Sequence, residues 1–281
     1  MDPLVLTLVL TAAVLHATWN ALVKSAGDPW VQLGIAKVAT VGFAVLFLPF
    51  VSFPDADAWP YLLVSAAIHQ VYYVFVSMQY RFGDLSHVYP LSRGSAPLLV
   101  AAGAFLFAGE TLNSNGILAV VIISLAILSL TFGTPWKSDD GKGAIFALGT
   151  GTTIAFYTVF DGLGGRTASD VFGYIIWLFI FEGIPFGLLV AFMRRRVFRA
   201  SFREHWKKGI FGGALSFFAY GLVIWAMSIT PMTYVSALRE TSVILAALIG
   251  TRMMGEPFGA RRITAAACVA AGVILLQVSK G

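Results

Sequence analysis

The sequence contains ten apolar segments in succession, each long enough to cross a lipid bilayer as a helix. About 20 helical residues cross a hydrocarbon core of about 30 Å. The segments lie at about 4–26, 30–52, 58–80, 86–108, 115–132, 142–164, 170–193, 207–229, 233–253 and 260–279. None shows the period-two alternation of a membrane β-barrel, so the pattern predicts an all-α integral membrane protein with ten transmembrane helices.

The composition is that of a chain that faces lipid. It is 58% hydrophobic and only 12% charged, whereas a soluble domain carries about 25% charged residues. This argues against an unusually apolar soluble enzyme. The net charge of +5 resides in short loops between the segments, so we expect no nucleic-acid partner. The single cysteine, Cys268, lies in an apolar segment, and we expect no disulfide, metal or cofactor.

Two segments 146 positions apart, Val88–Glu110 and Tyr234–Glu256, are related. Five of the 23 aligned positions are identical, including Arg93 with Arg239 and the Gly-Glu pair that ends each segment. The spacing from arginine to glutamate is the same in both, without a gap. We therefore predict that the chain consists of two related halves.

The most polar link between the halves runs from Thr131 to Lys142. We place a first five-helix repeat at 1–135 and a second at 140–281, which together form a single membrane domain. An odd number of crossings makes the second repeat enter from the opposite face, so the two repeats are expected to be inverted around a central cavity.

The distribution of lysine and arginine predicts the orientation. Loops after odd-numbered segments carry 14 of these 19 residues, the opposite face carries only Arg166 and Lys280, and Lys37, Arg93 and Arg239 lie within segments. Under the positive-inside rule, both termini are expected outside the cytoplasm. One miscounted segment would invert this result.

Charged side chains within spans are expensive, at about 2.5–3.5 kcal/mol each, and usually face a protein-lined interior. In the alignment of the halves, Lys37 matches Glu182. Opposite charges at equivalent positions suit either a zwitterionic substrate or a salt bridge. Arg93 is the first candidate to hold a carboxylate, because a guanidinium binds one bidentately. The alternative interpretation is that Arg93 lies near a helix end and extends its side chain to the membrane surface.

Aromatic and polar side chains share these helices. An aromatic stripe is more often packing or an interfacial belt than a binding wall, but neighbouring polar groups favour binding here. We predict no catalytic residues and no metal ligands. The predicted substrate-binding residues are His16, Trp19, Asn20, Lys37, His69, Tyr72, Tyr73, Tyr89, Ser92, Arg93, Tyr157, Asp161, Glu182, Trp225, Tyr234, Arg239 and Glu240.

Glu110 and Glu256 each follow a glycine at the end of an apolar segment. We interpret each Gly-Glu pair as a helix terminus at the membrane surface, in preference to a gate.

The chain resembles the drug/metabolite transporter superfamily, and in particular its EamA-type ten-helix carriers. The motifs that carry the resemblance are the two Gly-Glu pairs, Pro97, Gly116 and the face of the first segment formed by His16, Trp19, Asn20 and Lys24. It implies two inverted five-helix bundles, a central cavity lined mainly by the first four helices of each half, and peripheral fifth helices.

Members of the superfamily move amino acids, sugars, nucleotide sugars or drugs, and the YddG-type aromatic amino-acid exporters are the most similar in length and aromatic content. Val243 and Arg262 stand where a second-half proline and glycine would be expected. The loop count also opposes the cytoplasmic termini commonly assigned to relatives.

These observations predict a secondary transporter, not an enzyme, that exports small metabolites, chiefly amino acids including aromatic ones. It would act by alternating access in the bacterial inner membrane, in contact with the lipid bilayer, as a monomer or homodimer. The absence of a Walker motif argues against ATP; proton-coupled and facilitative transport both stay open. The alternative is an efflux carrier for drugs or cationic compounds. An intramembrane enzyme is the remote third reading, because HExxH and Gly-x-Ser-x-Gly motifs are absent.

Overall fold

The computed structural model describes residues 2–24, 28–83, 85–133, 140–245 and 259–279. All regular elements in this part of the chain are helices. They are α1 (Pro3–Lys24), α2 (Pro29–Phe47), η1 (Leu48–Phe50), η2 (Ala56–Ala58), α3 (Trp59–Phe82), α4 (Leu85–Ala108), α5 (Ser114–Ser129), η3 (Leu130–Gly133), α6 (Asp140–Thr167), α7 (Val171–Met193), α8 (Arg195–Ile229), α9 (Met232–Arg239) and α11 (Ala260–Val278).

Eight helices of the described residues are long and apolar enough to cross a membrane, and Pro3–Trp19 is a shorter apolar helix. This finding supports the predicted all-α membrane protein. The ninth predicted segment, 233–253, is interrupted where the structure describes it. Helix α9 ends at Arg239, Glu240 forms a turn, and residues 241–245 are helical again. The rest of that segment lies outside the described residues, so the count of ten spans stays a prediction.

Helix α8 begins at Arg195, twelve residues before the apolar segment predicted at 207. The stretch from 195 to 206 is strongly basic, so it carries no signal for a membrane span. It contains no glycine or proline, however, and its arginines and alanine are good helix formers. The helix therefore extends beyond the hydrophobic segment.

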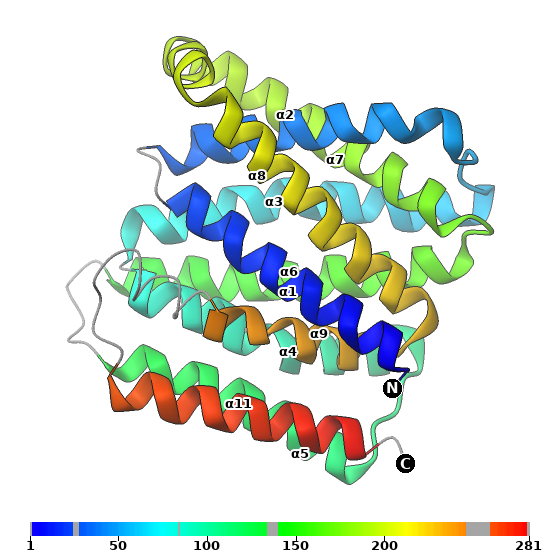
Figure 1. Ribbon diagram of the computed structural model, residues 1–281, viewed down its shortest axis with the longest axis vertical. Coiled ribbons are helices and arrows are strands. Elements are labelled where there is room, and N and C mark those ends of the chain that lie inside the picture. Colours follow the sequence, from blue (N-terminus) through cyan, green and yellow to red (C-terminus); the bar gives the residue numbers. More distant parts are fainter. Residues whose placement is uncertain (1, 25–27, 84, 134–139, 246–258, 280–281) are drawn as a thin grey trace.

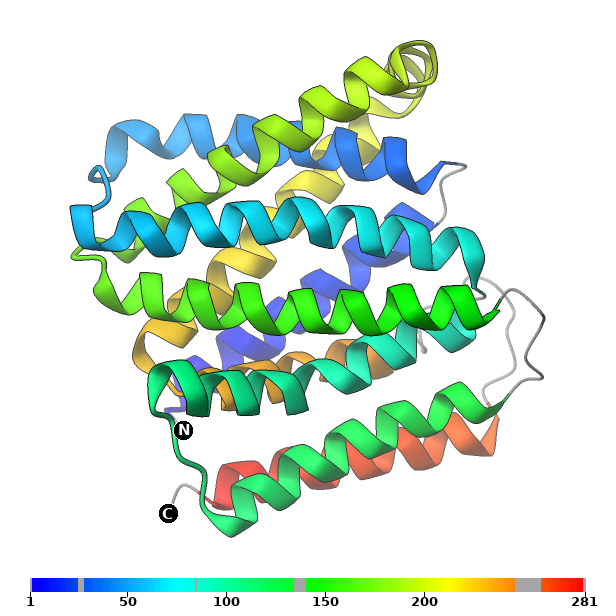
Figure 2. The ribbon, with the colours of Figure 1, turned by 180° about the vertical axis from the view of Figure 1, so that it is seen from behind.

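The helices run between two faces of the molecule, and both termini lie on the same face (Figure 1). Helix α6 packs against α3 and α4, α8 against α1 and α2, and α2 against α7. Helices α5 and α11, which the prediction makes the fifth helices of the two halves, lie side by side at one edge of the bundle (Figures 1 and 2). This peripheral position is the one that the superfamily resemblance implies.

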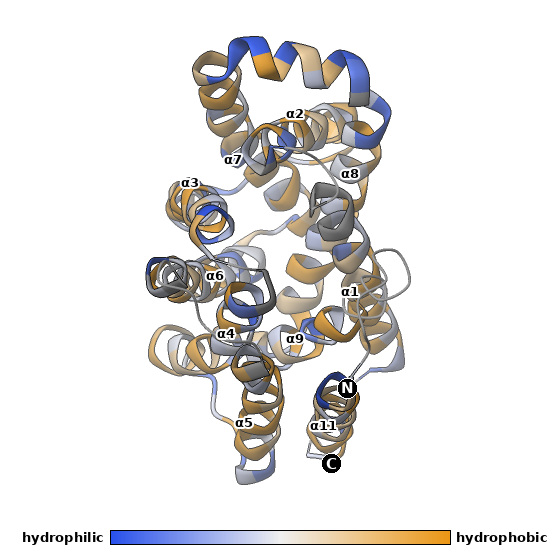
Figure 3. Ribbon diagram, turned by 90° about the vertical axis from the view of Figure 1, so that its left-hand side faces the viewer, coloured by the Kyte–Doolittle hydropathy of each residue, from blue (hydrophilic) through white to orange (hydrophobic). Residues whose placement is uncertain are grey.

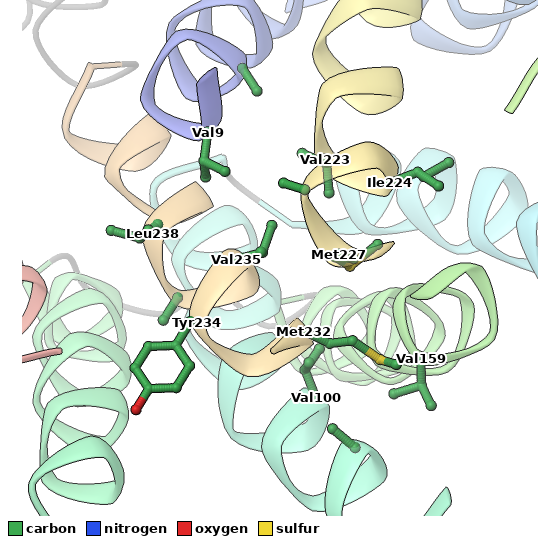
Figure 4. Packing of buried hydrophobic residues seen from close by; sticks show 14 of the residues in the cluster. Val9, Val100, Val159, Val223, Ile224, Met227, Met232, Tyr234, Val235 and Leu238 are labelled. Atoms are coloured by element: carbon green, nitrogen blue, oxygen red, sulfur yellow. The ribbon is translucent and has the colours of Figure 1, made fainter. Parts of the chain in front are cut away.

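The apolar core lies where α1, α8 and α9 meet α4 and α6 (Figure 4). Val9, Val235 and Met232 are fully enclosed there. Helices α4 and α6 approach closely because Gly151 has no side chain: a Cβ atom would lie 2.2 Å from Ser95 Oγ. In lipid, small residues of this kind promote helix association by allowing close backbone contact.

The Gly-Glu pair that ends α4 terminates the helix and also joins it to α9. Gly109 has a left-handed φ of 63°, and the Glu110 backbone N–H donates to the Ala104 carbonyl at 3.1 Å. The Glu110 carboxylate then accepts from the Met232 N–H at the start of α9 (2.9 Å) and from Arg166 Nη2 (2.6 Å). The predicted helix terminus is therefore present in the first half. Its counterpart at Glu256 lies outside the described residues.

Candidate functional site

A cluster of buried charged side chains lies between the helices. It contains three bases and three acids, each no more than 7% exposed: Lys37, Arg93, Asp161, Glu182, Arg239 and Glu240. They come from α2, α4, α6, α7 and the end of α9. Charges at this depth are tolerated when they are paired or face a polar interior. Because acids and bases are equal in number here, the charges can pair, and the structure pairs some of them.

Lys37 and Glu182 form a buried ion pair, with 2.8 Å between Lys37 Nζ and Glu182 Oε1. The Lys37 ammonium also lies 4.8 Å from the centre of the Tyr73 ring. Gln70 donates its side-chain amide to the Glu182 carbonyl at 2.9 Å. Of the two readings left open for these aligned opposite charges, the structure has the salt bridge, and it joins α2 to α7.

His69 extends this pair toward α3. Its Nδ1 atom lies 2.9 Å from the Ser65 carbonyl oxygen, which can only accept, so Nδ1 carries a hydrogen. Its Nε2 atom lies 3.3 Å from Glu182 Oε2. That contact is attractive only when a proton lies between the nitrogen and the carboxylate. His69 therefore lies against the carboxylate of the Lys37–Glu182 pair.

Arg93 forms the second ion pair, at 2.9 Å between its Nη2 atom and Glu240 Oε1. Its side chain is 4% exposed and that of Glu240 is 0% exposed. Arg93 is therefore an interior residue, and the alternative of an arginine that extends to the membrane surface is wrong. Glu240 can reach Arg93 because the turn after α9 points it toward α4.

Arg239 is buried, and none of the ion pairs among the described residues includes it. Among the described residues no carboxylate lies within ion-pair distance of its guanidinium, and its Nε and Nη2 atoms donate to no acceptor there. Its Cζ atom lies 5.9 Å from the centre of the Tyr220 ring, and the Tyr157 hydroxyl is adjacent. A buried guanidinium with unused donors is suited to bind an added anion.

Asp161 is held by tyrosines. Tyr174 donates its hydroxyl to Oδ1 at 3.2 Å, and Tyr220 donates to Oδ2. Both oxygens of this fully buried carboxylate therefore accept hydrogen bonds, as buried polar groups require.

Aromatic rings enclose the cluster. His69 stacks on Tyr157 with 4.2 Å between ring centres, and Tyr72 and Tyr220 contact Tyr157 edge-on. Tyr72 and Tyr73, both predicted substrate-binding residues, thus lie beside the charges, with 5.4 Å between their ring centres. Such rings offer apolar surface and polar hydroxyls at the same time.

The structure separates some predicted residues from the cluster. Tyr234 directs its hydroxyl to within 3.4 Å of Ser279 Oγ, toward α11 (Figure 4). Trp225 packs against the apolar core. Trp19 donates to His16 at 3.2 Å, and His16 is close enough to Arg93 to interact electrostatically. Three predicted residues remain. Ser92 donates to the carbonyl of Tyr89 at 3.0 Å within α4, and the Tyr89 ring packs against the apolar core. The side chain of Asn20 is outside the described part of the chain.

Four contributors were absent from the predicted set: Ser65, Gln70, Tyr174 and Tyr220. Tyr220 and Gln70 had a usable signal, because polar side chains within spans usually face the interior. Tyr174 lies near the start of its span, where a tyrosine is more often interfacial. Ser65 takes part through its backbone carbonyl, which sequence does not reveal, and also through its hydroxyl, whose oxygen lies 3.3 Å from His69 Nδ1.

Comparison with known proteins bears on the second half of the chain. Residues 141–278 match the EamA-like transporter family. A solved crystal structure, described only as that of a protein, superposes with a TM-score of 0.75 over 99% of this chain and 98% of that chain, at 12% identity. At that identity the similarity shows the fold alone. No curated protein sequence matches the chain significantly.

The family match supports the drug/metabolite transporter superfamily and a membrane transporter of small molecules rather than an enzyme. Several apolar helices of spanning length in the described residues agree with a multi-pass membrane protein in contact with the bilayer.

Proposed function

We propose that this protein is a secondary transporter that exports small zwitterions, chiefly amino acids including aromatic ones, across the bacterial inner membrane by alternating access. The resemblance to YddG-type exporters supports this cargo. The buried cluster supports it independently, because it offers a free guanidinium, carboxylates and an aromatic wall within one contiguous group of side chains.

The proposal rests on the environment of Arg239. Arg93 is engaged with Glu240 at 2.9 Å and Lys37 with Glu182 at 2.8 Å, whereas Arg239 has no carboxylate partner in the described residues. We therefore assign Arg239, in place of Arg93, as the group that binds the substrate carboxylate. Arg93 then holds Glu240 in position.

The other groups of a zwitterion have neighbours nearby. Asp161 and the Arg239 guanidinium both contact Tyr220: Asp161 accepts from its hydroxyl, and Arg239 Cζ lies 5.9 Å from the centre of its ring. The Asp161 carboxylate is suited to a substrate ammonium. Tyr72 and Tyr157, with His69, offer ring faces and edges to an aromatic side chain.

Alternating access requires two units that move against each other, and the packing supports two inverted repeats at 1–135 and 140–281. Helix α3 packs on α6 as α8 packs on α1, and α4 packs on α6 as α9 packs on α1. The pairs α2–α7 and α5–α11 each join equivalent helices of the two halves. A two-fold relation between inverted halves produces this pairing, with the site between them.

The test is uptake of radiolabelled amino acids by proteoliposomes that contain the purified protein. We expect Arg239→Gln to reduce uptake by about tenfold or more, as expected for a lost charged bidentate contact. Arg239→Lys should recover only part of it, because an ammonium lacks the planar fork. Tyr234→Phe is the matched control: Tyr234 lies in the same helix as Arg239, but its hydroxyl faces Ser279, so uptake by this variant should equal that of the wild type.

A wild-type protein that moves none of the twenty amino acids would contradict the proposed cargo. If the wild-type protein instead moves a quaternary ammonium dye, the alternative of a carrier for cationic drugs replaces the amino-acid proposal, since tyrosine faces also attract organic cations. Equal uptake by the Arg239→Gln variant and the wild type would show that another residue binds the carboxylate.

A further inference from the structure

The segment 194–208, between two candidate spans, forms a basic helix at the edge of the bundle. The preceding span ends at Met193 and the next begins at Trp206, while α8 already starts at Arg195. Figure 3 shows these first turns of α8, largely hydrophilic in colour, lying across the bundle beyond the end of α7. Because spanning helices precede and follow it directly, the segment lies at the level of the membrane surface.

Positive charge is concentrated on one side of this helix. The segment contains seven lysines and arginines and a single acidic residue, Glu204. Four of the cations recur at every fourth position, which places them in one row along the helix: Arg195, Arg199, Arg203 and Lys207. All four are exposed. Like charges at this spacing repel one another, so the row is favourable only beside a source of negative charge.

An aromatic row runs beside the cationic one, at Phe198, Phe202 and Trp206. Phe198 is partly buried against the core and stacks with Phe202 at 6.3 Å. Phe202 and Trp206 remain 41% and 45% exposed. Lys207 Nζ lies 5.7 Å from the centre of the Trp206 ring. Adjacent apolar and cationic rows are the pattern of a helix that lies in the boundary between headgroups and acyl chains.

We propose that the helix 195–207 is a binding site for anionic phospholipid headgroups, which lie against the cationic row while Phe202 and Trp206 enter the acyl boundary. An acidic protein or a nucleic acid would match the charge but would leave these two aromatic side chains in water. A lipid surface matches both rows, and the segment is already at its level.

The experiment measures lipid binding by the full-length protein in a neutral detergent, by native mass spectrometry with dioctanoyl-phosphatidylglycerol and dioctanoyl-phosphatidylcholine as probes. We expect phosphatidylglycerol to bind at a lower half-saturating concentration, and this preference to weaken as salt is added. Arg199→Gln combined with Arg203→Gln should raise that concentration about 25-fold, at about fivefold for each charge near an anionic surface.

The matched control removes two cations from the same face of the molecule, by Arg81→Gln with Lys142→Gln, and should change the half-saturating concentration less than about threefold. Equal binding of the two lipids by the wild-type protein, or an equal loss in both double variants, would overturn the proposal. Competition by inorganic phosphate at the concentration of the lipid would also overturn it, because the occupant would then be a soluble anion. Since wild-type lipid preference and its salt dependence need no variant, a poorly folding variant leaves the test intact.

Discussion

At the scale of single residues, the cluster is organised by which charges have partners. Lys37 with Glu182 and Arg93 with Glu240 are fixed across helices at 2.8 Å and 2.9 Å. A buried pair contributes little net stability, because desolvation offsets its attraction, but removing one partner leaves an uncompensated charge. These pairs are therefore expected to show strong coupling when each partner is changed in turn.

Arg93→Gln is expected to destabilise the protein by about 3–5 kcal/mol, because Glu240 is then left buried without its cation. The double variant Arg93→Gln/Glu240→Gln should recover most of this loss, since no isolated charge remains. Denaturant unfolding in detergent micelles measures both. As a control, Arg81→Gln removes an exposed cation of α3 and should change the free energy of unfolding by about 0.5 kcal/mol or less. Additive effects in the double variant would contradict the pairing.

At the scale of elements, the loops on the face that carries the termini are tied together by carboxylates that accept from backbone N–H groups. Glu110 caps α9 at Met232, Asp55 accepts from the Ser169 N–H at 2.7 Å, and Asp170 accepts from the Ser52 N–H at 2.8 Å. The Ser169 N–H lowers the pKa of the Asp55 carboxyl, because it stabilises the charged form. These bonds join loops of that face that are more than 100 positions apart in the chain.

Glu110→Ala is expected to lower the free energy of unfolding by about 1–2 kcal/mol, through the lost cap of α9. The partly exposed ion pair with Arg166 adds little to this. Glu110→Gln keeps one acceptor oxygen and should lose less than the alanine variant. Asp57→Ala, an acidic residue of the same face, is the control. Thermal unfolding in detergent measures these differences. Coincident unfolding curves for Glu110→Ala and the wild type would refute the cap.

At the scale of the whole molecule, charge is distributed unequally between the two faces. The loops after odd-numbered segments carry 14 of the 19 lysines and arginines, and the basic start of α8 belongs to that face (Figure 3). Both termini lie on the opposite face (Figure 1). Under the positive-inside rule we predict that the basic face is cytoplasmic and that the carboxylate-tied loops are extracytoplasmic.

Single cysteines introduced into a Cys268→Ala background test this orientation. In intact cells, a membrane-impermeant maleimide should label Asp57→Cys and leave Lys208→Cys unlabelled. After the cells are opened, both positions should react, which controls for exposure. The reverse pattern would place both termini, and the loops that Glu110 joins, on the cytoplasmic side.

The amino-acid sequence by itself determined the helical class, the approximate spans and most of the buried charged positions, because lipid imposes length and apolarity on each span and penalises isolated charge. Lys37, Arg93, Glu182 and Arg239 could be chosen on that basis alone. The peripheral position of α5 and α11 followed from the superfamily resemblance.

Only the tertiary structure decided how these residues are paired. Arg93 and Arg239 look equivalent in sequence, yet the turn at Glu240 gives a carboxylate to Arg93, while no carboxylate of the described residues pairs with Arg239. Tyr234 and Tyr220 look similarly placed, yet one faces Ser279 and the other Asp161. Such choices depend on the rotation of each helix and on contacts between residues far apart in the chain, from 45 positions for Tyr234 and Ser279 upward, which local patterns of hydrophobicity do not encode.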